Sequence, residues 1–173
     1  MKIVNIFAYR LFAFHYEKEL DNEYDRLMDL WYNAEYIYDF VKTNKNDIPE
    51  NKSVKKVSEQ IMDDAILIDE TLVEITKSDD RALSQFFKPL NNQEYKVKVL
   101  SLQKGRESYL RIYAIRIDDD TFVITGGAIK LHHLMEDREH TKEELSKLNS
   151  AKDYLKSKDI FDEDSFFEFL NED

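Results

Sequence analysis

The 173-residue chain contains no cysteine, so disulfide bonds, thiolate catalysis and thiolate metal sites are all excluded. Only three glycines and two prolines occur, which leaves little room for long irregular loops and predicts abundant secondary structure. No apolar run reaches the roughly 18 residues of a membrane helix, and we recognise no secretory leader. We therefore expect a soluble, cytoplasmic protein without a membrane partner.

The charge balance is acidic overall and basic in one segment. The formal net charge of −11 disfavours non-specific binding to nucleic acid, because phosphate backbones reward clusters of Lys and Arg. Residues 88–116, however, hold seven basic and two acidic residues, so this segment carries +5 and the remainder −16. The 42% hydrophobic content fits one folded domain with its own core.

The first half of the chain predicts a strand followed by a helical hairpin. Residues 2–16 are rich in β-branched and aromatic side chains, which predicts one long strand or a strand with a bend. Apolar residues at helical spacing predict a helix over 20–45 and another over 53–78, with Ser53 as its N-cap. The second helix has a heptad-like apolar seam, and the short linker predicts antiparallel packing. A short third helix is expected over 79–87.

The middle of the chain predicts an antiparallel meander of three strands over 94–103, 107–118 and 121–127, because the connections between them are short. Gly126 and Gly127 interrupt the third strand, and such glycines usually mark a bulge or a sharp bend.

Two helices end the chain, and each begins with capping-box spacing: Thr141 with Glu144, and Ser165 with Glu168. The element order predicts an α+β protein with one antiparallel β-sheet. In this prediction the N-terminal strand and the three-stranded meander pack against a long N-terminal helical hairpin and the C-terminal helices.

One face of the predicted meander gathers cations and tyrosines. Its members alternate on neighbouring strands: Lys96, Lys98, Tyr109, Arg111 and Tyr113. Lys130 joins them if the glycines shift the alternation by one residue. Cations can hold phosphate while tyrosine rings stack on unpaired bases, so this face suits RNA. The alternative is an ordinary solvated sheet face, and the pattern alone favours that alternative.

The histidines offer a weaker candidate site. Three of the four lie within nine residues, at His132, His133 and His140, beside several acidic residues. Neighbouring histidines in a loop rarely converge on one ion, so we expect no metal site and no cofactor. One functional histidine in a solvated loop is the preferred interpretation.

The run "FFKPLNNQEYKVKVLSLQKGRESYLRIYAIRIDDDTFVITGGAIKL", with "HTKEELSKLNSAKDYL" after it, resembles the RelE/ParE superfamily of bacterial toxins. The similarity is closest to the HigB and phage-derived branch and covers residues 84 to about 157. The following residues match in order: Phe87, Lys88, Pro89, Leu90, Tyr95, Arg111, Ile112, Tyr113, Gly127, Lys130, Thr141 and Ala151. The element order also fits that superfamily.

The resemblance implies a toxin of a bacterial type II toxin–antitoxin system that cleaves mRNA without metal, usually on the ribosome. In the ParE branch the activity is gyrase inhibition instead. The 2′-hydroxyl of the RNA would attack the neighbouring phosphate, assisted by a base, an acid and cations.

The resemblance also implies roles for individual residues. Arg111 and Lys130 would hold the scissile phosphate, and Tyr113 or Tyr109 would position a base. His132, His133 or His140 would act as acid or base. Lys96, Lys98 and Arg116 would add RNA contacts.

The chain departs from the pattern in charge and size. It would be a single RelE-like domain over residues 1–173, with a helical hairpin enlarged at about 20–87 and an extra acidic helix at about 163–171. Expected partners are mRNA or the ribosome, an antitoxin protein, and a second copy through the helical hairpin. The alternative is a non-catalytic RelE-like protein that binds a partner protein or RNA, and the sequence leaves enzymatic activity open.

Overall fold

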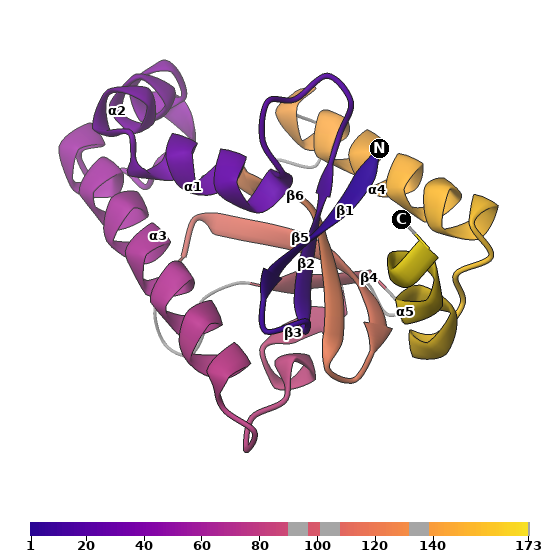
Figure 1. Ribbon diagram of the computed structural model, residues 1–173. Helices are drawn as coiled ribbons and strands as arrows, with labels where there is room; N and C mark the ends of the chain where they lie inside the picture. Colours follow the sequence, from indigo (N-terminus) through magenta and orange to yellow (C-terminus); the bar gives the residue numbers. More distant parts are fainter. Residues whose placement is uncertain (90–96, 101–107, 132–138, 173) are drawn as a thin grey trace.

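A six-stranded mixed sheet lies between two helical layers, in the order β1-β2-β6-β5-β4-β3 (Figure 1). The computed structural model describes residues 1–89, 97–100, 108–131 and 139–172, with the backbone alone at 88–89, 97–100 and 139–141. The strands are β1 Lys2–Phe7, β2 Leu11–His15, β3 Phe87–Pro89, β4 Val97–Leu100, β5 Leu110–Asp118 and β6 Thr121–Ile129. The α-helices are α1 Glu23–Tyr32, α2 Ala34–Thr43, α3 Val54–Lys77, α4 Glu139–Ser157 and α5 Glu163–Glu172.

The N-terminal segment is a hairpin and not the single strand expected over 2–16. The Arg10 N–H donates to the Phe7 carbonyl at 3.0 Å, and Ala8 and Tyr9 have φ angles of 54° and 53°. Positive φ angles at both central residues of the four-residue turn from Phe7 to Arg10 are typical of type I′, whose twist matches that of the flanking strands. The chain reverses here without any of the glycine or asparagine residues that usually announce this turn.

This reversal makes the sheet mixed, so the expectation of an antiparallel sheet is wrong at one pair. β2 runs parallel to β6, with Leu11 opposite Phe122 and Ala13 opposite Ile124. The remaining pairs of strands are antiparallel. Because the turn reverses the chain after β1, β1 lies at the edge of the sheet and β2 lies between β1 and β6.

The helix expected over 20–45 divides in two at Asn33. Asn33 has extended backbone geometry, with ψ at 104°, and its side chain accepts a hydrogen bond from the Tyr36 N–H. Asn22 caps α1 in the same way through the Asp25 N–H. An asparagine inside an apolar helical pattern can thus end one helix and start the next, because its side chain satisfies a free N–H group.

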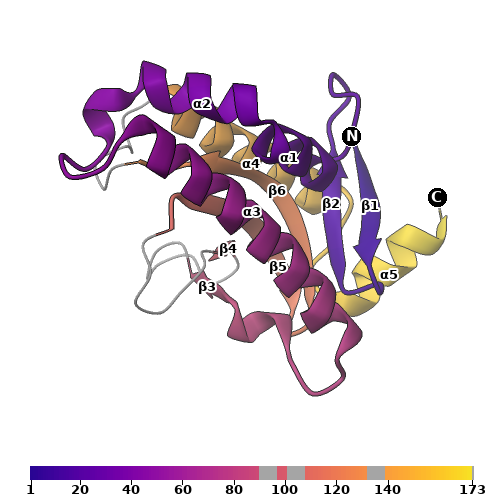
Figure 2. The same cartoon turned by 90° about the vertical axis from the view of Figure 1, so that its left-hand side faces the viewer.

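The long helix α3 confirms the predicted N-cap at Ser53, whose hydroxyl accepts from the Lys56 N–H. Its heptad-like seam is fully buried from Val57 to Ile75 and packs against α1, α2 and the sheet (Figure 2). The seam therefore belongs to the core of this chain, and the homodimer contact expected of the hairpin cannot use it.

The short helix expected over 79–87 is a single 3₁₀ turn, Leu83–Gln85, followed by the edge strand β3. Phe87 pairs with Leu100 of β4, and its ring stacks on Phe122 at a centroid distance of 4.9 Å. Burial of this ring beside the sheet outweighs helix propensity, so the meander has four strands instead of three.

Helices cover both faces of the sheet, so the sheet face expected to be open is covered over part of its area. Helices α1–α3 bury one face around residues such as Leu110 and Ile112, and α4 and α5 bury the other around Phe12 and Val123. The acidic α5 belongs to this second core, because Phe166 is fully buried and meets Phe12 edge to face at 5.0 Å.

Neither expected capping box forms. Helix α4 begins at Glu139, two residues before Thr141, and the Glu144 carboxylate binds the sheet instead. At α5 the box lies one turn earlier, since Asp162 accepts from the Ser165 N–H at 2.9 Å and Ser165 Oγ accepts from the Asp162 N–H at 3.1 Å. Among the helices described, none is long and apolar enough to cross a bilayer.

Candidate functional site

The two glycines of β6 lie at a β-bulge, as their position in the sequence predicts. Tyr113 is opposite Gly126, whereas the next residue of β5, Ala114, is opposite Ile124. Thr125 is the extra residue, and its hydroxyl donates to the Tyr113 carbonyl at 3.2 Å. The bulge shifts the alternation of β6 by one residue and re-aims the remainder of the strand.

The glycines have a second role, because a helix approaches the strand closely on each face. A Cβ at Gly126 would collide with Oε2 of Glu144, from α4. A Cβ at Gly127 would lie 2.8 Å from a methyl carbon of Leu27, from α1, and 2.7 Å from the Arg111 carbonyl oxygen. A side chain at either position would therefore displace the Glu144 carboxylate or crowd Leu27 and the backbone of β5.

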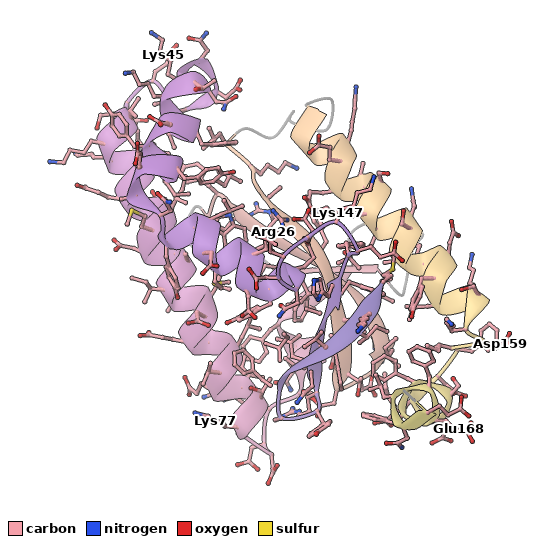
Figure 3. The ribbon with its side chains drawn as sticks, turned by 45° about the horizontal axis from the view of Figure 1, so that its top comes forward. Arg26, Lys45, Lys77, Lys147, Asp159 and Glu168 are labelled. Carbon is pink, nitrogen blue, oxygen red and sulfur yellow. The ribbon has the colours of Figure 1, made fainter. Side chains whose placement is uncertain are left out.

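Four charged side chains meet beside the bulge, and we call Glu23, Arg26, Glu144 and Lys147 the ion cluster. Arg26 donates to both carboxylate oxygens of Glu23 at 2.8 Å, and Lys147 Nζ approaches them at 3.2 and 3.3 Å. Both cations also approach Glu144, at 3.8 Å from Arg26 and 3.7 Å from Lys147. Figure 3 shows Arg26 and Lys147 close together between α1 and α4.

The cluster is balanced in charge, with two carboxylates and two cations, and its carboxylates are buried. Glu23 is fully inaccessible to solvent. Burial raises the pKa of Glu144 to about 7, with Glu23 adding to the shift, while Lys147, Arg26 and the Gly127 N–H oppose it. A carboxylic acid of this pKa exchanges its proton near neutral pH, as a general acid or base must.

Aromatic hydroxyls surround the ion cluster. Tyr16 Oη donates to the Thr125 carbonyl at 2.8 Å, and Lys147 Nζ lies 5.5 Å from the Tyr16 ring centroid. Burial, together with the charges of Glu23 and Glu144, raises the pKa of Tyr16. Tyr36 of α2 is 38% exposed. Burial raises the pKa of its hydroxyl, Arg26 opposes this shift, and Glu144 adds to it.

Of the predicted site residues, Tyr113 lies opposite Gly126 beside this cluster, and Arg111 is two residues earlier on β5. Both are half-buried, and Arg111 donates to the carbonyls of Ser108 and Leu110 at 2.8 Å. Burial lowers the pKa of Arg111. Burial raises the pKa of Tyr113, which Arg111 opposes and Glu144 reinforces. Tyr113 therefore interacts electrostatically with both Arg111 and Glu144.

The pairing of β5 with β6 places Lys130 relative to Arg111. Arg111 is opposite Ala128, and the Lys130 N–H donates to the Tyr109 carbonyl at 2.6 Å. Lys130 comes two residues after Ala128, so alternation assigns it to the face of Arg111. Tyr109 was expected on this face, and that expectation is wrong. Its ring is buried in the core beneath the helical hairpin, with Lys52 Nζ 3.3 Å from its hydroxyl.

Of the other predicted RNA contacts, the structure describes the side chain of Arg116 alone. Arg116 is opposite Phe122 and pairs with Asp119 at the end of β5. Lys98 is opposite Ala114 in the ladder, and its side chain is not described. Lys96, His132 and His133 lie outside the described residues, and of His140 only the backbone is described.

The ion cluster was missed at the sequence level, although a signal for it exists. Glu23 with Arg26, and Glu144 with Lys147, are acid–base pairs at (i, i+3) spacing on helices. Such pairs are common on solvated helix faces, so neither one stands out alone. Only the glycine pair of β6, which lets two helices approach closely, distinguishes these pairs from surface pairs.

Within the described ranges, no group of three or more His, Cys, Asp or Glu side chains could hold a metal ion. The chemistry available at the bulge is that of two carboxyl groups, one guanidinium, one ammonium group and tyrosine hydroxyls. No family model, curated protein or solved structure matches the chain.

Proposed function

We propose that this chain is a RelE-like toxin that cleaves RNA without a metal ion. The observation that carries the proposal is Glu144, a carboxyl group with a pKa of about 7 beside Arg26 and Lys147. RNA cleavage by its own 2′-hydroxyl needs a base that is active near neutral pH and cations that stabilise a pentavalent phosphorus. Glu144 would supply the base, and Arg26 and Lys147 would supply the cations, close to Tyr113.

In the proposed reaction Glu144 accepts the proton of the 2′-hydroxyl, and the 2′-oxygen attacks the adjacent phosphorus. The bond from phosphorus to the 5′-oxygen breaks, and the 5′-oxygen leaves as a hydroxyl after it takes a proton from an acid. The products are a 2′,3′-cyclic phosphate and a 5′-hydroxyl end. His132, His133 or His140, which the resemblance to the toxin superfamily implicates, is the candidate acid.

The cations would have two roles: some would bind the scissile phosphate, and another would stabilise the charge that develops in the transition state. Arg111 and Lys130, which alternation assigns to one face of the sheet, would hold the scissile phosphate. Lys147 is partly exposed and would approach the negative charge that develops on the phosphate oxygens. Tyr113 or the partly exposed Tyr36 would position an unpaired base by stacking.

The proposal is tested by inducing expression in a bacterial host and by incubating purified protein with mRNA and ribosomes. Wild-type protein should arrest growth and fragment mRNA. Glu144→Gln should lower the cleavage rate about 100- to 1,000-fold, the usual contribution of a general base. Arg111→Ala and Lys130→Ala should abolish growth arrest, whereas Arg81→Ala, which changes an arginine 50% exposed, should not.

Intact mRNA and normal growth with folded wild-type protein would remove the enzymatic proposal. The second candidate is then a non-catalytic RelE-like protein that binds RNA or a partner protein, such as an antitoxin. The net charge of −11 favours this candidate, and so does the pairing of both cluster carboxylates with cations. Gel-filtration co-elution with ribosomes or with the product of a neighbouring gene would support it.

A further inference from the structure

The sheet ends in two edge strands of different quality, β1 and β3. β3 has only three residues and ends at Pro89, which has no N–H to donate to a further strand. β1 has six residues without a proline, and among the described residues it pairs with β2 alone. Figure 1 shows β1 in front of the other strands, between the two helical layers. β1 is therefore the edge that can accept another strand.

The backbone of β1 has hydrogen-bonding groups on its outer side. In an antiparallel pair, alternate residues direct their N–H and C=O groups toward the partner strand, and the others direct them away from it. Sheet edges are commonly protected by charged side chains or bulges. β1 has one charged residue, Lys2 at its start, and one bulge, between Asn5 and Phe7. Its regular part, Lys2 to Asn5, is thus a template for a strand.

Both apolar cores reach this edge with side chains that are only partly buried. Ile6 and Phe7 pack against the core beneath the helical hairpin. Ile3 packs against the second core, where Leu170 of α5 is also partly buried. A strand added beside β1 would place its side chains alternately on both faces, next to these residues. The chemistry of the edge therefore fits an apolar β-strand.

The charge distribution favours a second copy of this chain as the source of that strand. The chain has a net charge of −11, but residues 1–16 contain Lys2, Arg10 and no Asp or Glu. Two carboxylates bond to this segment, and both are paired there: Glu17 with the Met1 amino group and Asp120 with Arg10. Two acidic chains can meet at this hairpin without bringing unpaired carboxylates of β1 together, because it has none.

We propose that two copies of the chain associate through β1, which pairs antiparallel with β1 of the second copy about a twofold axis at Val4. Val4 then lies opposite its own counterpart, Ile3 opposite Asn5, and Lys2 opposite Ile6. Each pair joins residues whose numbers are both odd or both even, as two strands need if opposite side chains are to share a face. The contact is isologous and makes one continuous sheet of the two. It involves no residue assigned to RNA cleavage.

The first test is the mass of the full-length protein in solution, measured by light scattering after gel filtration over a range of concentrations. Wild type should approach twice 20.7 kDa. Val4→Lys sets two ammonium groups opposite each other and should raise the dimer Kd at least about tenfold. The matched control is Ile66→Lys, the same charge change at a 46% exposed position of α3, and its Kd should stay within about twofold of wild type.

The second test remains informative if Val4→Lys fails to fold. Because the chain has no cysteine, a single introduced one reports its own contacts. Residues directly opposite in antiparallel strands have Cα atoms about 4.5–5.5 Å apart, which a disulfide can span. Val4→Cys should therefore form a covalent dimer on mild oxidation, and the control Ile66→Cys should not.

A wild-type protein that stays monomeric up to about 100 μM would overturn the inference, and a strand of another protein would then be the candidate for this edge. Equal dimerisation of Val4→Lys and Ile66→Lys, or equal cross-linking of the two cysteine variants, would overturn it too. Glu144→Gln should dimerise like wild type, which separates this test from that of RNA cleavage.

Discussion

The Gly127 N–H donates a hydrogen bond of 2.9 Å to the carboxylate of Glu144, and this bond joins the bulge of β6 to helix α4. It exists because the neighbouring residue, Gly126, has no side chain in the place that the carboxylate occupies. The glycine pair is thus needed for the position of α4 as well as for the bend of the strand.

Gly126→Ala should destabilise the protein by about 2–3 kcal/mol, because the new methyl group would overlap the Glu144 carboxylate in a packed interior. The change is measured by urea denaturation monitored by the fluorescence of Trp31. Because the clash involves one side chain, the double variant with Glu144→Ala should lose less stability than the sum of the two single variants.

Gly127→Ala is the matched control for this coupling. Its methyl group would meet Leu27 and the Arg111 backbone on the other face of the sheet, so Glu144→Ala should not relieve it. Additive losses in the Gly126–Glu144 pair would contradict the assignment of that glycine to the approach of α4.

Arg10 provides a second long-range link, from the β1–β2 turn to the end of α3. Its guanidinium donates to the carbonyls of Ile75, Thr76, Ser78 and Arg81, at 3.0, 3.1, 2.9 and 2.6 Å, and also binds the Asp120 carboxylate. The last carbonyls of a helix have no partner within the helix, so these bonds act as a C-cap supplied by a distant residue.

Arg10→Ala should lower the free energy of unfolding by about 3 kcal/mol, since several partly buried carbonyls lose a charged donor. Arg10→Lys should recover at most half of the loss, because an ammonium group cannot reproduce the planar fork of donors. The exposed Arg81→Lys change should alter stability by less than about 0.5 kcal/mol. A similar small effect at Arg10 would show that water replaces its bonds without cost.

The sequence predicts the α+β class, the α3 cap, the meander and the bulge, because each depends on local residues with strong preferences. The N-terminal hairpin and the break at Asn33 depend on weak local signals. Ala8 and Tyr9 are poor residues for positive φ, so the turn forms only because pairing of β1 with β2 outweighs their strain.

The candidate site also contains residues that the sequence predicts and residues that it does not. Alternation along β5 correctly separates Arg111 and Tyr113 from the buried Leu110 and Ile112. Tyr109 departs from this alternation, because its ring lies in the core beneath the helical hairpin, where Lys52 contacts its hydroxyl. The ion cluster depends on side chains of α1 and α4 meeting beside the bulge of β6, and the (i, i+3) pairs and glycines that signal it do not report which helices come together.

The strained turn predicts a stabilising change. Replacing Ala8 with Asn and Tyr9 with Gly should raise the free energy of unfolding by about 1–2 kcal/mol, because this pair adopts two positive φ angles readily. Thermal unfolding would report it as an increase in Tm. Tyr9→Ala is the control, since it removes the ring but keeps the strained backbone, and it should give no gain. If Tyr9→Ala stabilised as much as the double variant, the exposed ring and not the backbone would be the source of strain.

The raised pKa of Glu144 predicts a pH dependence of stability with a definite sign. The folded protein holds this proton up to about pH 7, whereas the ordinary value for the group is 4.5. Between these values the folded state binds more protons than the unfolded chain, so stability falls as pH rises. From about pH 5 to pH 8 the unfolding free energy of wild type minus that of Glu144→Gln should fall by on the order of 2–3 kcal/mol.

The comparison with Glu144→Gln isolates this group, because all other carboxylates titrate in both proteins. Glu168→Gln, at an exposed position of α5, is the matched control and should give a difference from wild type that does not change with pH. If Glu144 also serves as the base in RNA cleavage, the rate should rise with pH through the same region, around pH 7, and this limb should vanish in Glu144→Gln. A stability difference that stays constant from pH 5 to pH 8 would mean that Glu144 is ionised throughout, and it would remove the basis for its role as a base.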